Sequence, residues 1–207
     1  MIIVAQSTYT GVEVGLHNET SLIKAVTLDK KEACTQLIPT INALLQQEGI
    51  TLDSVTEIIV NKGPAPFSSL RTVIATMNGI AYASGIPLFG VSAFDALNYA
   101  HNPNGDKSLL IVLHAYSKEY YYGFYNPGGN PVIGTCSSDR LPSVTLTRDT
   151  FIIGHPDALS TDMQNSIQIT PLNYCTVSEL AQYGLYTIQN GLSGCKKISP
   201  LYIKNHF

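Results

Sequence analysis

The residues with the clearest chemical potential lie where an apolar run gives way to a helical pattern. A β-branched stretch ends at Val60, and Asn-Lys-Gly-Pro-Ala-Pro at 61–66 leads into the helical pattern. A strand, a tight loop and a helix start, in that order, direct free backbone N–H groups and the positive end of the helix toward one point. The candidates for contact with an anionic ligand such as phosphate are Gly63, Ser68, Ser69 and Arg71. The same pattern equally fits a junction that binds nothing and in which the two serines only cap the helix.

Other residue types that carry chemistry are present without the spacing that their usual sites require. The five histidines form neither an H-x-x-x-H nor an H-E-x-x-H pair, and the four cysteines form no C-x-x-C pair. We therefore expect reduced thiols and no metal site. No G-x-S-x-G elbow supports a serine nucleophile. The tyrosines at 120–122 are typical of a strand, although such a run can also stack on bases.

The composition favours a globular protein with a surface poor in charge. Of the 207 residues, 44% are hydrophobic and 13% are charged, against roughly 25% charged in an average globular protein. Such a surface is covered by uncharged polar residues or is partly buried against a partner. The net charge of −3 and the lack of a long basic run argue against independent binding of nucleic acid. No long apolar stretch and no signal peptide are recognisable, so we expect a cytoplasmic protein without a membrane segment.

Hydrophobic periodicity predicts the elements that position the junction. Alternating apolar residues predict a three-strand meander over 2–28, and apolar residues at helical spacing predict a helix over roughly 35–47. Pro39 lies inside this helix, which must therefore start near Ile38 or bend at the proline. The rest of the first half is predicted as a strand at 55–60, a helix at 68–84, a strand at 88–91 and a helix at 93–100. The resulting order is βββαβαβα.

A second meander begins about 105 residues after the first. Strands are predicted at 109–113, 120–125, 132–136 and 151–154, followed by one clear helix at 178–189. The repeated βββ start predicts an α/β protein of two lobes, each a mixed sheet, with the second lobe degenerate. We expect an N-terminal lobe of residues 1–100 and a smaller C-terminal lobe of residues 101–207 that includes the helix near 178–190.

This order is the plan of the actin/sugar-kinase/Hsp-type (ASKHA) ATPases, which have an RNase H-like fold. In that class, the turn after the first strand of a lobe normally carries an acidic residue that helps to hold Mg²⁺ and phosphate. Here the two turns are Gln-Ser-Thr-Tyr-Thr-Gly at 6–11 and His-Ala-Tyr-Ser at 114–117, and both lack an acid. An amide does not supply the charge that a hard cation takes from its oxygen ligands. Phosphoryl transfer by this chain alone is therefore not expected.

Two segments of the first half carry recognisable motifs. They read Gly-Pro-Ala-Pro-Phe-Ser-Ser-Leu-Arg at 63–71 and Gly-Ile-Pro-Leu-Phe-Gly-Val-Ser-Ala-Phe-Asp-Ala-Leu at 85–97. This text resembles that of the TsaB/YeaZ family, which is close to GPGSFTGLR, followed by a helix and GIPLxGVSSxxAL. Relative to the family text, the loop of this chain lacks two glycines and has one more proline. These changes remove conformational freedom and one backbone N–H group. The chain is identified as a divergent member.

The resemblance implies the ASKHA fold and a role in the synthesis of N6-threonylcarbamoyladenosine (t6A) in tRNA. It implies a non-catalytic scaffold for a homologous transferase (TsaD), joined by an ATPase (TsaE). It also implies that tRNA is contacted only indirectly and that ATP or ADP binds only within the complex. The alternative is a stand-alone nucleotide-binding ATPase or kinase of the same fold. Docking is expected through the helices at 35–47 and 68–84, and the resemblance leaves open whether the chain also forms a homodimer through the same helices.

Within these helices, the expected partner surface is the apolar stripe. Its residues are Leu37, Ile41, Leu45, Leu70, Val73, Met77 and Ile80. If this interpretation is right, Val73→Glu or Met77→Glu abolishes complex formation while the monomer stays folded. The second helix also carries the small residues Ala75, Gly79 and Ala83, which would let another helix approach closely or would face the lobe's own sheet. The sequence leaves open which side of each helix faces the sheet.

Overall fold

The computed structural model describes residues 1–115, 119–137, 150–155 and 169–203. The chain forms two compact units, one of Met1–Ala96 with Thr176–Leu201 and one of Leu97–Cys175 with Tyr202–Phe207. The boundary between the units after Ala96 thus lies close to the predicted boundary at residue 100. The helix near 178–190, however, belongs to the first unit and not to the C-terminal lobe in which the sequence placed it.

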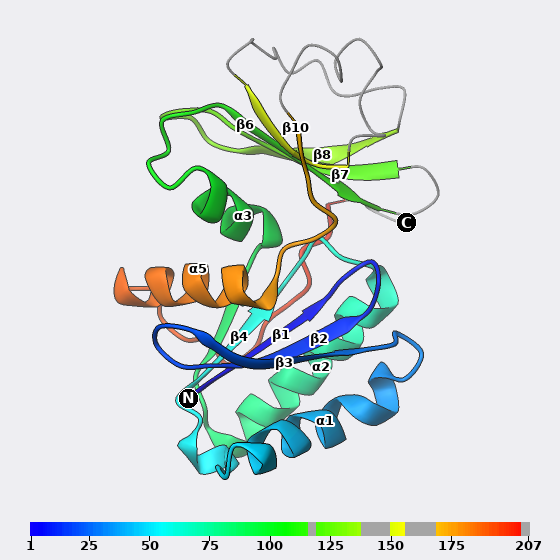
Figure 1. Ribbon diagram of the computed structural model, residues 1–207, viewed down its shortest axis with the longest axis vertical. Helices are drawn as coiled ribbons and strands as arrows, with labels where there is room; N and C mark the ends of the chain where they lie inside the picture. The colour runs from blue at the N-terminus through cyan, green and yellow to red at the C-terminus, as the bar shows by residue number, and fades with distance from the viewer. Residues whose placement is uncertain (116–118, 138–149, 156–168, 204–207) are drawn as a thin grey trace. The chain divides into compact units, whose positions relative to one another are not determined.

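The first unit is built on a five-stranded sheet in the order β3-β2-β1-β4-β5 (Figure 1). Its strands are β1 (Ile2–Ser7), β2 (Val12–His17), β3 (Leu22–Leu28), β4 (Glu57–Asn61) and β5 (Leu88–Val91). The first three strands are antiparallel neighbours, as the meander pattern predicts, and β4 and β5 continue the sheet in parallel with β1. Every residue of β1 and β2 is buried, which requires cover on both faces of the sheet.

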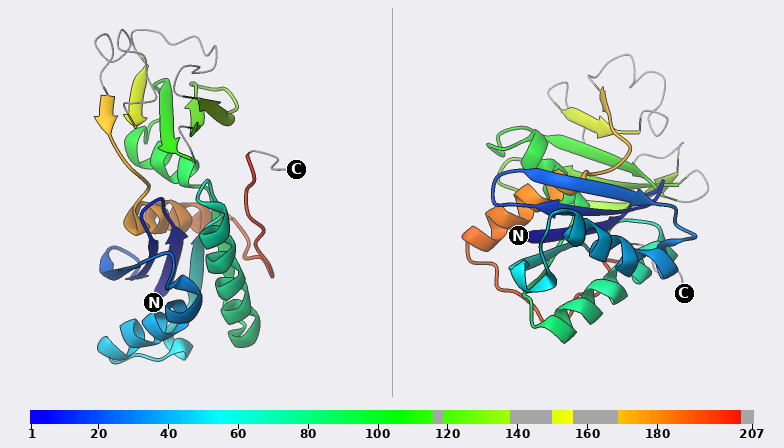
Figure 2. Two further views of the ribbon diagram at one scale, coloured as in Figure 1. Left: turned by 90° about the vertical axis from the view of Figure 1, so that its right-hand side faces the viewer. Right: turned by 60° about the horizontal axis from the view of Figure 1, so that its bottom comes forward.

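Helices provide that cover. On one face, α1 (Ala33–Gln47) and α2 (Phe67–Ser84) pack beside each other, and α5 (Val177–Gln189) crosses the other face (Figure 1, Figure 2). A short 3₁₀ turn, η1 (Leu52–Ser54), leads from α1 to β4. After β5, α3 (Ala93–His101) carries the chain from the first unit into the second.

The alternation of each strand divides its side chains between the two helical layers. Ile3 and Val14 belong to the core that α1 and α2 cover. Ile59 faces α5, which approaches the sheet very closely at Gly184, because a Cβ atom added at Gly184 would lie 2.6 Å from Ile59 Cδ1. The first unit therefore has two separate apolar contacts, one on each face of its sheet.

Local signals account for the helix ends. α2 stops at Gly85, whose φ of 74° is the left-handed conformation that favours glycine, and whose N–H donates to Ala81 O at 2.9 Å. α5 begins with a capping box between Thr176 and Glu179. Pro39 lies inside α1, which already begins at Ala33, so the alternative that this helix starts near Ile38 is wrong.

The second unit contains a sheet in the order β10-β9-β6-β7-β8. Its strands are β6 (Leu109–His114), β7 (Glu119–Tyr125), β8 (Val132–Ser137), β9 (Phe151–Gly154) and β10 (Ile169–Pro171). The predicted second meander is present as antiparallel β6, β7 and β8, and β9 pairs with β6 in parallel. The two mixed sheets with their helices confirm the predicted two-lobed α/β class. Among the described residues, no helix is both long and apolar enough to cross a membrane.

Candidate functional site

The loop between β4 and α2 is held by internal hydrogen bonds. Gly63 is buried with a φ of 126°, and its N–H donates to Asn61 Oδ1 at 2.8 Å. Its carbonyl accepts from Ala93 N at 3.1 Å, and the neighbouring Lys62 carbonyl accepts from Leu201 N at 2.7 Å. The glycine is required because the backbone conformation is one that other residues rarely adopt. These contacts give Gly63 a structural role in joining β4, α3 and the segment after α5.

The start of α2 differs from the capped start that the sequence predicts. The N-cap position is Pro66, which makes no side-chain cap hydrogen bond. Ser69 is buried, and its Oγ lies 2.7 Å from Ser7 Oγ at the end of β1. Ser68 is exposed, and so is Arg71, whose guanidinium carbon lies 3.8 Å from the centre of the Phe67 ring. The four candidate ligand residues are therefore not brought together, because two are buried in internal contacts and two lie on the surface.

The turn after β1 is likewise closed on itself. Thr8 N donates to Gly11 O at 2.8 Å, and Gly11 N donates to Thr8 Oγ1 at 3.0 Å. These backbone N–H groups are therefore already engaged within the turn.

A carboxylate does lie beside this turn, on the neighbouring strand. Glu13 of β2 stands directly opposite Gln6, and Gln6 Nε2 donates to Glu13 Oε2 at 2.6 Å. Asn61 Nδ2 donates to Gln6 Oε1 at 3.5 Å, and all three side chains are buried. The result is a polar row across β2, β1 and β4. The sequence analysis missed it, although the short turn at 8–11 fixes the hairpin register that pairs Gln6 with Glu13.

The residues predicted as a partner surface lie in the core. Leu37, Ile41, Leu45, Leu70, Val73 and Met77 are each no more than 5% exposed, and Ile80 is partly buried against the same core. They face the strands β1, β2 and β4 because the apolar stripe of each helix is what covers the sheet. The prediction that this apolar stripe is the partner surface was therefore wrong. The exposed surface of α1 and α2 is the opposite one.

That outer face of α1 and α2 is almost free of charge. The 15 residues of α1 contain no charged side chain, and among the 18 residues of α2 only Arg71 is charged. Large apolar side chains project from it, with Ile38 61% exposed and Tyr82 90% exposed. Ala75, Gly79 and Ala83 are also exposed, so the small residues face away from the sheet. Cys34 Sγ of α1 lies 3.5 Å from Thr72 Oγ1 of α2, where the helices adjoin.

In the second unit, the fold gathers two histidines that are distant in sequence. The rings of His114 at the end of β6 and His155 just after β9 lie 5.4 Å apart, and both lie within 6 Å of the Tyr120 ring. Within the described ranges, no three His, Cys, Asp or Glu side chains group in a way that could hold a metal ion. We assign these three rings to aromatic packing at one end of the sheet.

Comparisons with known proteins agree with this architecture. Over 98% of this chain, the fold matches 99% of a Pseudomonas aeruginosa protein described as similar to the peptidase YEAZ, with a TM-score of 0.74 and 18% sequence identity. This likeness shows a shared α/β fold of two units. Residues 28–139 match the family described as TsaD, tRNA N6-adenosine threonylcarbamoyltransferase. The chain belongs to that family, as a divergent member of its TsaB/YeaZ group.

The matches to curated relatives cover only part of each relative. An uncharacterized protein of Mycobacterium leprae is 30% identical over 144 residues, which are 68% of this chain and 38% of the relative. The tRNA threonylcarbamoyladenosine biosynthesis protein TsaB of Buchnera aphidicola is 29% identical over 97 residues, which are 46% of each chain. This chain thus spans about half, or less, of these curated relatives.

Proposed function

We propose that this chain is a non-catalytic subunit that docks a TsaD-type transferase in the t6A modification of tRNA. The observation that carries this proposal is the outer face of α1 and α2, which presents exposed Ile38 and Tyr82 beside a single charged residue, Arg71. The names of the relatives indicate the t6A pathway. The outer face of α1 and α2 is the surface through which we expect the chain to dock.

The outer face has the physical character of a helix-docking surface. Protein interfaces are enriched in aromatic residues and depleted in Lys, Glu and Asp, and the two helices follow that composition. The exposed Ala75, Gly79 and Ala83 recur every four residues, and such small side chains let a second helix approach closely. A pair of partner helices laid on α1 and α2 would form a mixed helical bundle. A second copy of this chain would compete for the same face.

The remaining parts of the proposed role follow from the closed loops of the first unit. The turn at 8–11 and the loop at 61–66 use their backbone groups internally, which supports a subunit that binds no nucleotide outside its complex. ATP or ADP then enters with a TsaE-type ATPase, and tRNA is reached only through the transferase. Such a role implies a cytoplasmic location.

The test is co-purification of the full chain with the TsaD-type protein of the same organism, with the complex sized by light scattering. We expect a stable complex with the wild-type chain. Ala75→Glu should weaken it by about a hundredfold or more, because it buries an unpaired carboxylate in the interface. Ala100→Glu makes the same change at an exposed position of α3 and should leave the complex intact. If Ala75→Glu bound the partner as Ala100→Glu does, the assigned face would be wrong.

Two further results separate the proposal from its alternatives. Met77→Glu is not a test of docking, because Met77 is fully buried and the change should unfold the first unit. A titration with ATP and Mg²⁺ tests the stand-alone enzyme. Tight binding with turnover by the purified chain would replace the scaffold proposal by an ATPase or kinase.

A further inference from the structure

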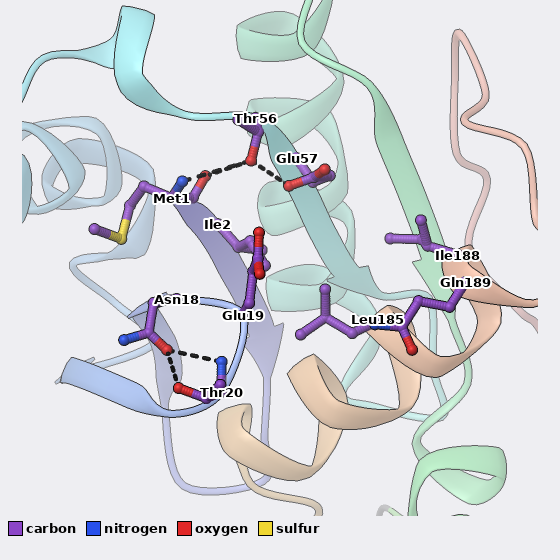
Figure 3. Close-up of a pocket in the computed structure, with 10 residues that line it drawn as sticks. All are labelled: Met1, Ile2, Asn18, Glu19, Thr20, Thr56, Glu57, Leu185, Ile188 and Gln189. Atoms are coloured by element: carbon purple, nitrogen blue, oxygen red, sulfur yellow. Dashed lines mark hydrogen bonds between the residues drawn. The ribbon is translucent and has the colours of Figure 1, made fainter.

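The first unit contains a pocket that the proposed function does not use. It has a volume of about 610 Å³ and lies where four segments meet: the start of β1, the hairpin between β2 and β3, the start of β4 and the last turn of α5 (Figure 3). Ile2, Leu185 and Ile188 give it an apolar lining. This volume lies within the range of about 300–1,000 Å³ that is typical of small-molecule sites.

Two carboxylates line this pocket, and neither pairs with a cation among the residues that the structure describes. Glu19 comes from the hairpin and Glu57 from the start of β4 (Figure 3). Glu57 accepts a hydrogen bond from the Thr56 hydroxyl, and Glu19 is exposed at the mouth. Neither forms an ion pair within the described ranges, and the Met1 amino group donates to Thr56 Oγ1 at 3.5 Å instead. The pocket therefore presents negative charge beside an apolar wall.

A third acceptor stands in the same row of the sheet. His17 and Glu57 lie on either side of Ile2 in the strand register, so all three side chains project to the face of the sheet that α5 covers. His17 Nδ1 contacts the Asn18 carbonyl, so Nδ1 is the donor, and in the neutral ring Nε2 is then an acceptor. Nε2 is buried and has no hydrogen-bond partner in the part of the chain that the structure describes. A buried acceptor of this kind is costly unless a donor reaches it.

We propose that this pocket binds an alkyl cation, an ammonium or guanidinium group on an aliphatic chain. The charged side chains that line it are the two carboxylates of Glu19 and Glu57, so the complementary ligand is a hydrogen-bond donor. The negative charge selects a cation, and the wall of Ile2, Leu185 and Ile188 suits the methylene chain that carries it. A free polyamine-type molecule and an arginine or lysine side chain of another protein share this chemistry.

The experiment is isothermal titration of the full chain at low ionic strength with two probes. Agmatine represents the free cation, and Nα-acetyl-arginine methylamide represents the side chain of a protein. Saturable binding of both probes would mean that the site also accepts an arginine side chain of another protein. Saturable binding of agmatine alone would mean that the site accepts only the free cation. Added salt should weaken either interaction, because charge pairs near the surface are screened.

Charge-removing variants locate the binding. Glu57→Gln and Glu19→Gln should each weaken agmatine binding by about tenfold or more, since each removes a charge-assisted hydrogen bond. Glu48→Gln makes the same change at an exposed position just after α1 and should leave affinity unchanged. Circular dichroism spectra that match the wild type establish that the variants are folded. Failure of both probes to saturate, or equal affinity in the Glu19→Gln/Glu57→Gln double variant and the wild type, would overturn the proposal.

Discussion

The hydroxyl of Ser69, in the first turn of α2, lies 2.7 Å from the hydroxyl of Ser7, the last residue of β1. Both side chains are buried, with Ser7 1% and Ser69 6% exposed. This contact ties the beginning of α2 to the end of β1, just before the turn at 8–11. The serine that looked like a ligand or cap residue in the sequence is thus part of the internal structure of the first unit.

Ser69→Ala should lower the free energy of unfolding by about 1–3 kcal/mol, because it leaves the Ser7 hydroxyl buried without this partner. The neighbouring Ser68 is exposed, so Ser68→Ala should change stability by less than about 0.5 kcal/mol. Urea unfolding followed by circular dichroism measures both. The Ser7→Ala/Ser69→Ala double variant should cost less than the sum of the single variants. Equal effects of Ser68→Ala and Ser69→Ala would show that the contact contributes nothing.

Two helical glycines should respond to alanine with opposite signs. A Cβ atom at Gly184 of α5 would lie 2.6 Å from Ile59 Cδ1 and 2.9 Å from Ile59 Cγ2, so Gly184→Ala should destabilise the chain by about 1–3 kcal/mol. A Cβ atom at Gly79 of α2 would meet nothing within 4 Å, and Gly79→Ala should stabilise by about 0.5–1 kcal/mol through helix propensity. Thermal unfolding of the two variants compares them directly. A gain of stability in Gly184→Ala would mean that α5 does not pack as closely as described.

Tyr183 should make the stability of the chain fall in alkaline solution. Burial, and after it the charges of Asp95 and Tyr186, raise the pKa of Tyr183 from 10.0 to about 12. Between these values the folded chain holds a proton that the unfolded chain has lost. The contribution of this group is therefore fully present below pH 10 and is lost as the pH rises toward 12.

The measurement is the phenolate absorbance of the wild type minus that of Tyr183→Phe, which isolates the titration of Tyr183. We expect its midpoint well above that of an exposed tyrosine. A midpoint at the ordinary value near 10 would contradict the partial burial of Tyr183 and the effect of the Asp95 charge on it.

The four cysteines should separate into two reactive and two protected thiols. Cys34 and Cys195 are exposed, whereas Cys136 and Cys175 are buried. Burial also raises the pKa of the Cys136 thiol, which lowers the fraction of reactive thiolate. Titration of the native chain with a thiol reagent should therefore give two fast equivalents, and all four should react after denaturation.

Serine variants assign those thiols. Cys34→Ser should remove one fast equivalent, and Cys136→Ser should remove none. Fast modification of Cys136 in the native chain would be inconsistent with its place beside Tyr120 in the core of the second unit.

Much of the first unit could be predicted because its signals are local. The alternation of Val12, Val14 and Leu16 identifies a strand whichever helices cover it, and Gly85 followed by Pro87 marks the end of α2. The loop at 61–66 was also placed correctly between β4 and α2. The roles of its residues were not predictable, because the partners of Gly63 and Ser69 lie in other segments of the chain.

The orientation of the helices shows the limit of periodicity. A stripe such as Leu37, Ile41 and Met77 is apolar whether it covers a sheet or a partner, since both environments exclude water. Only the positions of β1 and β2 show that this stripe is core and that Ile38 and Tyr82 are exposed. The carboxylate of Glu13 is a similar case, because the strand register brings it beside Gln6.

The sequence by itself determined the order of the elements, the two repeated meanders and the TsaB/YeaZ resemblance, because periodicity, turn residues and motif text are all properties of neighbouring residues. The tertiary structure alone decided that α5 belongs to the first unit, that the face of α1 and α2 with Ile38 and Tyr82 is the outer one, and that Glu19, Glu57 and the last turn of α5 share a pocket. These facts depend on contacts between segments far apart in the chain, and such contacts are fixed only when the apolar stripes are buried together.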